Sequence, residues 1–270
     1  MAVPVDLAYV IKSRQIGCDV TTQRRTALMK LSLVIPCYNE AQGLPLLVEK
    51  CRRLHHTCGA EIILVDNGST DDSEAILARL TKGEPGLRMI SVGVNRGYGH
   101  GIVAGLRAAT GDVLGWTHAD LQTDPADAAR AFALFGETAN PERLFVKGRR
   151  YGRPLTDRLF TAGMSLFETI LTRRSLWDIN AQPTLFHRSF FESWSDPPDD
   201  FSLDLFAFWQ ARIGGRLVRR IPVLFGKRAY GRSHWNLGMS ARVRFIARTL
   251  DYSFQLRRRL RSTSEDRPAC

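Results

Sequence analysis

The segment THADLQTDP, residues 117–125, combines residue types that can hold a metal ion together with an anionic ligand. Asp120 offers a hard carboxylate oxygen, and Gln122 lies one pleat further along the same face of an extended chain. Mg²⁺ takes one or two oxygens from a protein and fills its other positions with phosphate oxygens and water, so this pair suits a cation that already carries two phosphates. Asp124 and Pro125 are more typical of the first turn of a helix. The segment therefore predicts a metal–diphosphate site at the end of a strand.

Three further apolar runs end in polar segments: IPCYNE at 35–40, VDNGST at 65–70 and NRGYGHG at 95–101. Pro36 is expected to end its strand, and Tyr38 and Glu40 face one side at a spacing of two. Each segment taken alone is as typical of a polar loop or a helix cap as of a binding site. The G-x-G spacing in NRGYGHG indicates NAD only weakly, because the dinucleotide motif follows the first strand of its unit. We interpret these glycines as positions of close backbone approach.

The elements that position these segments are strands and helices in alternation from Leu31 onward. Strands are expected at 31–36, 61–69, 88–93, 112–120, 143–148 and 216–225, and helices at 43–54, 71–80, 100–110 and 125–135. Residues 158–174 form an Arg-rich amphipathic stretch. Such alternation predicts an α/β fold with a mainly parallel sheet covered by helices on both faces. Ligands of these sheets bind beyond the carboxyl ends of the strands, where all four polar segments would meet.

In this order and at these separations, the four segments resemble the family-2 glycosyltransferases of GT-A fold. The resemblance is closest to their polyprenol-phosphate branch, the dolichyl-phosphate mannose synthase-like enzymes, and spans roughly residues 31–235. It implies a GT-A, Rossmann-like sheet that binds a GDP- or UDP-linked sugar, with a magnesium or manganese ion held by His118, Asp120 and Gln122. The residues that it places around the nucleotide are Pro36, Tyr38, Glu40, Asp66, Asn95, Ala119 and Ser233.

His118 departs from that family, because it stands where the first acid of the D-x-D metal motif is expected. A neutral imidazole removes one negative charge and, if it binds the metal, favours manganese or zinc over magnesium. The alternative is that His118 does not bind the metal and instead hydrogen-bonds to the groups that do.

Further matches lie downstream in the chain. VKGRRYG at 146–152 resembles the family's Gly-Ser-Arg segment, whose arginine lies near the acceptor phosphate, and this points to Arg149. DINAQP at 178–183 retains the Asp178 of another family turn. The pattern R-x-x-G-x-S places Arg228 and Ser233 in a segment that closes over the donor phosphates in the family. The resemblance thus assigns catalysis to Asp120, Arg149 and Arg228.

The acceptor is expected to be a phosphate, because the sequence offers no convincing general base. A hydroxyl acceptor needs one, whereas a phosphate monoester is already anionic near neutral pH. We therefore expect an inverting transferase that moves a hexose from a nucleoside-diphosphate sugar to a polyprenyl phosphate in cell-envelope polysaccharide synthesis. A hydroxyl acceptor in a glycan or lipid-linked saccharide remains an alternative, for which Asp178 or Asp204 would have to act as the base. A non-catalytic sugar-nucleotide-binding protein is a second alternative, motivated by His118.

Positive charge is concentrated near the C-terminus. Residues 212–262 contain 14 of the 38 Lys and Arg residues but only one of the 27 Asp and Glu residues. Within 242–261 the arginines and the apolar residues fall on different helical faces, which is typical of a helix at an anionic membrane surface. A helix packed on the domain is the alternative, and nucleic acid is not expected because the basic tract lacks interleaved aromatic residues. We expect a flexible extension at 1–29, a transferase domain at 30–235 and a basic amphipathic segment at 236–270, in a peripheral protein on the cytoplasmic, inner face of the membrane.

Overall fold

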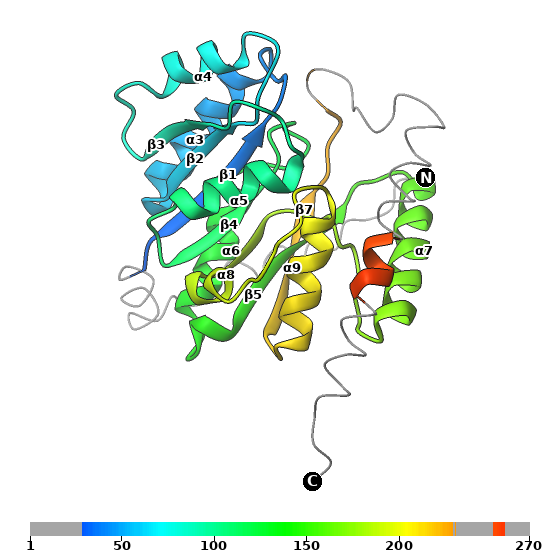
Figure 1. Ribbon diagram of the computed structural model, residues 1–270. Coiled ribbons are helices and arrows are strands. Elements are labelled where there is room, and N and C mark those ends of the chain that lie inside the picture. Colours follow the sequence, from blue (N-terminus) through cyan, green and yellow to red (C-terminus); the bar gives the residue numbers. More distant parts are fainter. Residues whose placement is uncertain (1–28, 229, 231–250, 257–270) are drawn as a thin grey trace, which may run out of the picture.

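The computed structural model describes residues 29–228, 230 and 251–256 (Figure 1). Its elements are, in chain order, β1 (Leu31–Cys37), α3 (Leu44–Cys58), β2 (Glu61–Asp66), α4 (Ser73–Thr81), β3 (Leu87–Ser91), α5 (Tyr98–Ala108), β4 (Val113–Trp116), α6 (Asp127–Gly136), η1 (Pro141–Arg143), β5 (Leu144–Tyr151), α7 (Leu155–Thr172), β6 (Thr184–His187), α8 (Arg188–Glu192), α9 (Ser202–Ile213) and β7 (Leu217–Leu224).

The described strands form one sheet in the order β3-β2-β1-β4-β6-β5-β7, in which β6 alone runs antiparallel to its neighbours. The predicted mainly parallel sheet is therefore confirmed. Because β5 and β7 run in the same direction as β1 and β4, their carboxyl ends lie at one edge of the sheet. All the polar segments that the sequence singled out up to Arg228 converge on this edge.

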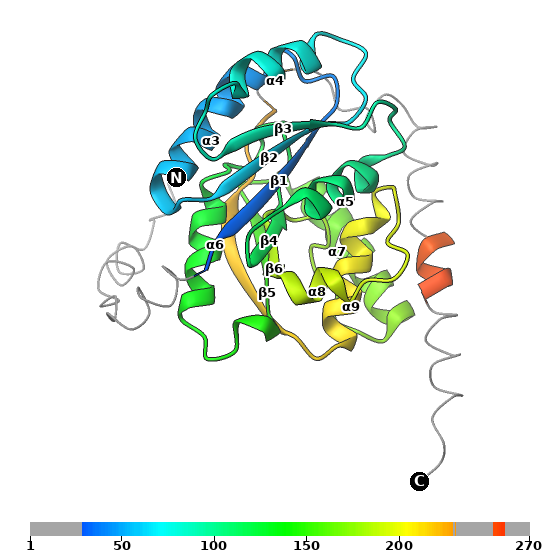
Figure 2. The same cartoon turned by 60° about the vertical axis from the view of Figure 1, so that its left-hand side comes forward.

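Helices cover both faces of the sheet (Figure 2). The buried residues of α3 and α6 pack with those of β1 and β2 in one core, which includes Leu47, Phe132 and Ile62. The residues of α5, α8 and α9 pack on the other face in a second core, which includes Ile102, Phe190 and Phe206. β1 and β2 are buried almost throughout, as expected of strands that are covered on both sides.

Pro36 does not end β1, contrary to the expectation from the sequence. The strand continues to Cys37, and Pro36 pairs in register with Val65 of β2. The ladder with β4 has already ended at Val34, whose carbonyl accepts from Thr117 N. The backbone groups of residue 36 point toward that unpaired side, so the missing N–H of proline removes no ladder hydrogen bond.

The strand β6 was not expected from the sequence. It has four residues, and its pattern does not alternate between buried and exposed positions. It follows a cis peptide bond between Gln182 and Pro183 and inserts between β4 and β5. Within the helix expected at 242–261, residues 251–256 form a helical segment that packs beside α7, where Ser253 Oγ donates to Glu168 Oε1 over 2.7 Å. Ser253 and Leu256 are buried, so these six residues pack on the domain, whereas the rest of 236–270 lies outside the described residues.

The expected N-terminal extension likewise lies almost entirely outside the described residues. Among the helices of the described ranges, none is long and apolar enough to cross a membrane.

Candidate active site at the carboxyl edge of the sheet

The ends of β1 and β2 are joined by hydrogen bonds that shape one side of the site. Asn39, which has a positive φ of 53°, accepts from Thr70 N through its side-chain oxygen, and its own backbone N donates to Ser69 Oγ. Asp66 is buried, and Ser69 N donates to its Oδ2. No described residue donates to the buried Asp66 Oδ1 or Asn67 Oδ1. These two acceptors are suited to N–H or O–H groups of a ligand, since buried acceptors are rarely left without a partner.

The glycines of NRGYGHG do allow a close backbone approach, as the sequence predicted. Gly97 has a φ of 132°, and a Cβ at this position would lie 2.4 Å from the carbonyl oxygen of Asp199. The approach is to the loop before α9 rather than to a ligand. It fixes the first turn of α5, and with it Tyr98, at the edge of the sheet.

Asp120 and Gln122 lie in a tight turn after β4. Gln122 N donates to Asp120 Oδ1 over 3.1 Å, and the intervening Leu121 has a φ of 61°. The Gln122 side chain donates through Nε2 to the Gly226 carbonyl, and Gly226 N donates back to the Gln122 carbonyl. No hydrogen bond from the described residues reaches Asp120 Oδ2. Gln122 thus fastens the segment after β7 to the predicted metal motif, while Asp120 keeps one carboxylate oxygen for a ligand.

His118 lies in an aromatic stack rather than in a cluster of ligands. Its ring stacks on Tyr98 with centroids 5.4 Å apart, and Tyr98 stacks in turn on Phe201 at 4.7 Å. Burial raises the pKa of the Tyr98 hydroxyl, and the charges of Asp204 and Asp120 act in the same direction. Tyr98 therefore remains a neutral phenol between the core and the metal motif, and it holds the face of the imidazole.

Glu40 forms an ion pair with Arg228 across the site. Burial raises the pKa of the Glu40 carboxyl; Arg228 opposes this shift and the nearby Asp120 adds to it. The influence of Asp120 on Glu40 places the ends of β1 and β4 within electrostatic range of each other. The structure therefore brings together Glu40, which was predicted beside the nucleotide, and Arg228, which was predicted beside the donor phosphates. Asp120 lies near this pair.

A second group of charged side chains lies near the end of β5 and in the middle of β7. We call Arg150, Arg153 and Arg220 the arginine cluster. Arg150 donates to Asp178 Oδ1 through Nε over 2.8 Å, and its backbone N donates to Oδ2. Arg220 lies 3.9 Å from Asp178 Oδ2, and burial lowers its pKa to about 10, so that it stays charged at neutral pH. With three cations around one carboxylate, the cluster has an excess of positive charge that suits an anion.

Two buried nitrogens of this cluster, Arg153 Nε and Arg220 Nη1, have no hydrogen-bond partner among the described residues. Arg149, which the sequence analysis chose instead, is exposed on β5 opposite Pro222 of β7. Counted from Gly148, the third position of the Gly-Ser-Arg pattern falls on Arg150, and this count would have identified the arginine that binds Asp178. Arg220 could be suspected from the two arginines inside the strand pattern RLVRRIPVLF.

The two groups meet at adjacent residues after β7. The guanidinium groups of Arg150 and Arg153 lie 5.2 and 5.4 Å from the ring centroid of Phe225. The next residue, Gly226, makes both hydrogen bonds with Gln122, and Arg228 reaches Glu40. One short segment therefore contacts the arginine cluster, the predicted metal motif and the predicted nucleotide side.

With this geometry established, comparison with known proteins identifies the family. The family model of glycosyl transferase family 2 matches residues 32–193, more than half of the chain. The chain belongs to glycosyl transferase family 2. The matched range includes Asp66 and Asp120 but ends before β7, so the family-2 match says nothing of Arg220 or Arg228.

Curated relatives in the same family are polyprenyl-phosphate enzymes by name. The chain is 40% identical over 115 residues to an undecaprenyl-phosphate 4-deoxy-4-formamido-L-arabinose transferase from Enterobacter sp., which is 41% of this chain and 35% of that protein. The same enzyme from Photorhabdus laumondii is 34% identical over 176 residues, covering 62% of this chain and 51% of that protein. The chain thus spans about a third to a half of the length of these relatives.

Solved structures confirm the GT-A fold. Glucosyl-3-phosphoglycerate synthase from Mycobacterium tuberculosis, in complex with UDP, superposes with a TM-score of 0.62 at 19% identity and covers 87% of this chain and 83% of that one. A mannosyltransferase from Pyrobaculum calidifontis, in complex with GDP-Man and Mn²⁺, gives a TM-score of 0.56 at 22% identity, covering 83% and 65%. At these identities the likeness concerns the fold alone.

The donor set at the metal motif fits a divalent cation only when phosphate oxygens complete its coordination. In the described residues, no group of three or more His, Cys, Asp and Glu side chains could hold a metal ion by itself. Asp120 Oδ2 and Gln122 Oε1 are two oxygens from residues two positions apart in one turn, and two is the number that Mg²⁺ or Mn²⁺ takes from a protein beside a diphosphate. The remaining predicted nucleotide residues are less informative: Tyr38 is half-buried, Ala119 is buried, Asn95 Oδ1 accepts from Gly97 N, and Ser233 lies outside the described residues.

The two carboxylates that a hydroxyl acceptor would need are both engaged elsewhere. Asp204 is fully buried on α9, 3.2 Å from Lys147 Nζ. Asp178 is buried between Arg150 and Arg220, and these cations hold its pKa below the usual value although burial acts in the opposite direction. Neither side chain has the solvent access of a general base, and the pKa of Asp178 is lowered rather than raised.

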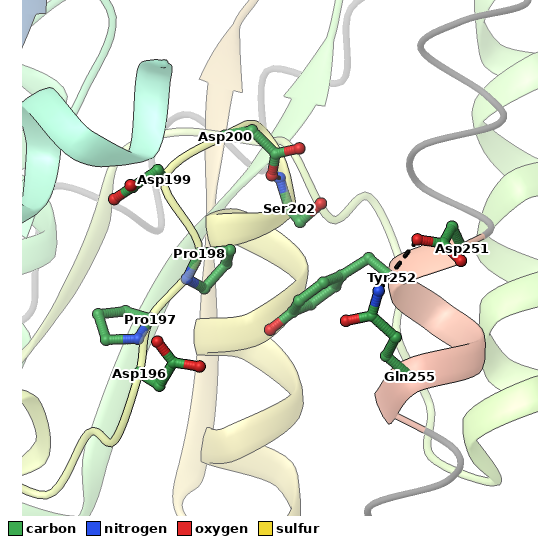
Figure 3. A pocket seen from close by; sticks show the side chains of 9 residues that line it. All are labelled: Asp196, Pro197, Pro198, Asp199, Asp200, Ser202, Asp251, Tyr252 and Gln255. Carbon is green, nitrogen blue, oxygen red and sulfur yellow. Dashed lines mark hydrogen bonds between the residues drawn. The ribbon is translucent and has the colours of Figure 1, made fainter. Parts of the chain in front are cut away.

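A separate pocket of about 480 Å³ lies between the loop before α9 and residues 251–256 (Figure 3). Its lining includes four carboxylates, Asp196, Asp199, Asp200 and Asp251, and no residue of the strand ends. A pocket of this charge repels a nucleoside diphosphate, so it is not the donor site.

Proposed function

We propose that the protein is an inverting glycosyltransferase that moves a hexose from a nucleoside-diphosphate sugar to a polyprenyl phosphate. The observation that carries this proposal is that one segment, Phe225–Arg228, contacts both halves of the carboxyl edge of the sheet. One half is the side with the predicted metal motif and Glu40, and the other is the side with the arginine cluster. Gly226 and Arg228 lie with the predicted metal motif and Glu40, and Phe225 lies against the arginine cluster. A donor diphosphate and an acceptor phosphate are both anions, and the two halves offer each of them its own cationic groups.

On the donor side, Asp66 and Asn67 offer buried oxygens to the base and ribose. Asp120 and Gln122 would hold a magnesium or manganese ion on the diphosphate; when bound, this ion would neutralise charge on the leaving group. Arg228 leaves Glu40 and binds the diphosphate, which adds further stabilisation where negative charge develops.

On the acceptor side, the arginine cluster orients the phosphate, with Arg149 at its exposed margin. An oxygen of the acceptor phosphate attacks the anomeric carbon as the bond from that carbon to the diphosphate breaks. The nucleoside diphosphate leaves with the bonding electrons, and in-line attack inverts the anomeric centre. No proton has to be removed from the acceptor, which agrees with the engaged state of Asp178 and Asp204.

The names of the relatives and the UDP and GDP complexes of the structural neighbours support this assignment without fixing the sugar or the base. We further propose that the protein works as a peripheral protein on the inner, cytoplasmic face of the membrane, where nucleotide sugars are made.

The test is an incubation of the full chain with UDP- and GDP-sugars, Mg²⁺ or Mn²⁺, and a short-chain polyprenyl phosphate, followed by mass analysis of the lipid product. The matched control acceptor is the polyprenol without its phosphate. The proposal is supported if the sugar is transferred to the polyprenyl phosphate but not to the polyprenol, and if Arg150→Ala and Arg220→Ala each weaken this transfer. Transfer to the alcohol, or nucleotide binding without transfer to either acceptor, contradicts it.

A further inference from the structure

Helix α7 exposes its apolar side and buries its mainly polar side, which is the reverse of an ordinary surface helix. Four apolar side chains form a stripe on its outer face: Leu155, Leu159, Leu166 and Ile170 are 65%, 64%, 59% and 69% exposed. At 100° per residue these four lie within about 60° of arc. Phe160 and Phe167 are also exposed and widen the stripe.

The inner face of α7 is mainly polar. Its buried residues are Ser165, Glu168, Leu171 and Thr172. Glu168 accepts from Ser253, and burial raises its pKa to about 7. A surface helix normally turns its apolar residues to the core. The described residues therefore bury the polar side of α7 and leave its apolar side for something else.

The position of the stripe identifies the kind of partner. Arg153, a member of the arginine cluster, precedes Leu155 by two residues and donates to Thr161 of α7 through Nη1 over 2.8 Å. A lipid phosphate held at this cluster has an apolar chain that must leave it, and the stripe begins two residues after Arg153. This step rests on the proposed function, because that function provides the lipid acceptor.

The charges around the stripe agree with a lipid surface. Arg158 is exposed on the helix, Arg173 and Arg174 are exposed directly after it, and Asp157 is the exposed acid on the helix. A helix with an apolar stripe and a surplus of arginines fits the interface of an anionic bilayer, where the apolar side enters the acyl boundary and the arginines meet the headgroups.

We infer that the apolar face of α7 is the membrane-docking surface of the protein and the surface along which the polyprenyl chain of the acceptor reaches the arginine cluster. The expected docking element at 242–261 is not needed for this inference. The six residues of that range that the structure describes pack on the domain.

The experiment measures flotation of the full chain with vesicles of phosphatidylcholine and phosphatidylglycerol that contain no polyprenyl phosphate. Leu159→Gln/Ile170→Gln is expected to lower the partition coefficient roughly tenfold or more, because two exposed apolar side chains are lost from the docking face. The matched control is Leu46→Gln/Leu217→Gln, which replaces two exposed leucines on α3 and β7 and should leave flotation unchanged.

Two other occupants of the stripe would be recognised in the same experiment. If Leu159→Gln/Ile170→Gln loses a dimer seen for the wild type by light scattering, the stripe is an interface between copies. If it unfolds at a clearly lower temperature, the stripe is covered by another part of the chain. Either result, or unchanged flotation, overturns the inference.

A measurement on the unmodified protein avoids any doubt about folding. A photoreactive probe dissolved in the acyl phase of the vesicles should label peptides from 155–172, and labelling confined to other peptides would overturn the inference. The proposed function is tested separately by transfer to the short-chain acceptor in solution without vesicles, so either proposal can fail while the other stands.

Discussion

Arg228 and Glu40 are 188 residues apart in the sequence and form an ion pair over the nucleotide side of the site. The proposed function requires Arg228 to exchange this carboxylate for the donor diphosphate. A double-mutant cycle of Glu40→Gln and Arg228→Ala in urea unfolding should therefore give a coupling of about 0.5–3 kcal/mol without ligand. With saturating UDP or GDP and Mn²⁺ the coupling should shrink toward zero. A coupling that nucleotide leaves unchanged would mean that Arg228 stays with Glu40.

Asp120 is expected to be the single carboxylate of the metal motif. Asp120→Ala should abolish transfer and the metal-dependent part of nucleotide binding, which calorimetry with UDP or GDP and with or without Mn²⁺ can separate. His118→Asp restores an acidic side chain and should keep or raise activity with Mg²⁺. Wild-type turnover of Asp120→Ala would remove the metal role from this residue. Complete loss in His118→Asp would show that the imidazole stacked on Tyr98 has a task of its own.

Lys147 and Asp204 form a fully buried pair that Gln182 and Thr184 complete with hydrogen bonds. Lys147→Met should cost about 3–5 kcal/mol of unfolding free energy, because it leaves Asp204 buried without its counter-charge. Lys147→Met/Asp204→Leu should be less destabilised than either single variant, because both charges are then gone. Additive losses in urea unfolding would contradict this account of the pair.

Glu168 predicts a pH dependence of stability. Burial raises its pKa from 4.5 to about 7, so between these values the folded protein binds a proton that the unfolded chain releases. The stabilisation is complete below about pH 4.5 and is lost as the pH rises through 7. Glu168→Gln keeps a neutral side chain at every pH. It should therefore match the wild type near pH 4 and exceed it by about 1–3 kcal/mol at pH 8 in thermal unfolding. An equal difference at both pH values would show that Glu168 does not titrate in this range.

The sheet was predictable from the sequence because its signals are local. Runs such as IILV within EIILVD are apolar throughout and lie between helical patterns, and this fixes a parallel strand and its burial. β6 was missed because four residues after a turn carry too little pattern. Its place between β4 and β5 depends on partners far away in the chain.

The meeting of the predicted donor-side residues at one edge of the sheet was predictable for a similar reason. Residues such as Asp66 and Asp120 each end a strand, and topology brings strand ends together. On the acceptor side, Arg149 was chosen although the count from Gly148 gives Arg150, and the contact of Arg150 with Asp178, 28 residues away, is seen only in the structure. The orientation of α7 was equally hidden, because an amphipathic pattern locates two faces but does not say which one is buried.

The segment from Phe225 to Arg228 also has a kinetic consequence. Because its residues touch the donor side and the arginine cluster at once, the proposed movement of Arg228 onto a diphosphate should displace Phe225 as well. Substrates should then bind in compulsory order, with the nucleotide sugar first. An unreactive phosphate analogue of the acceptor would inhibit uncompetitively against the donor, and the nucleoside diphosphate would inhibit competitively against it. The order of substrate binding is in this way set by a segment of four residues rather than by the depth of either site.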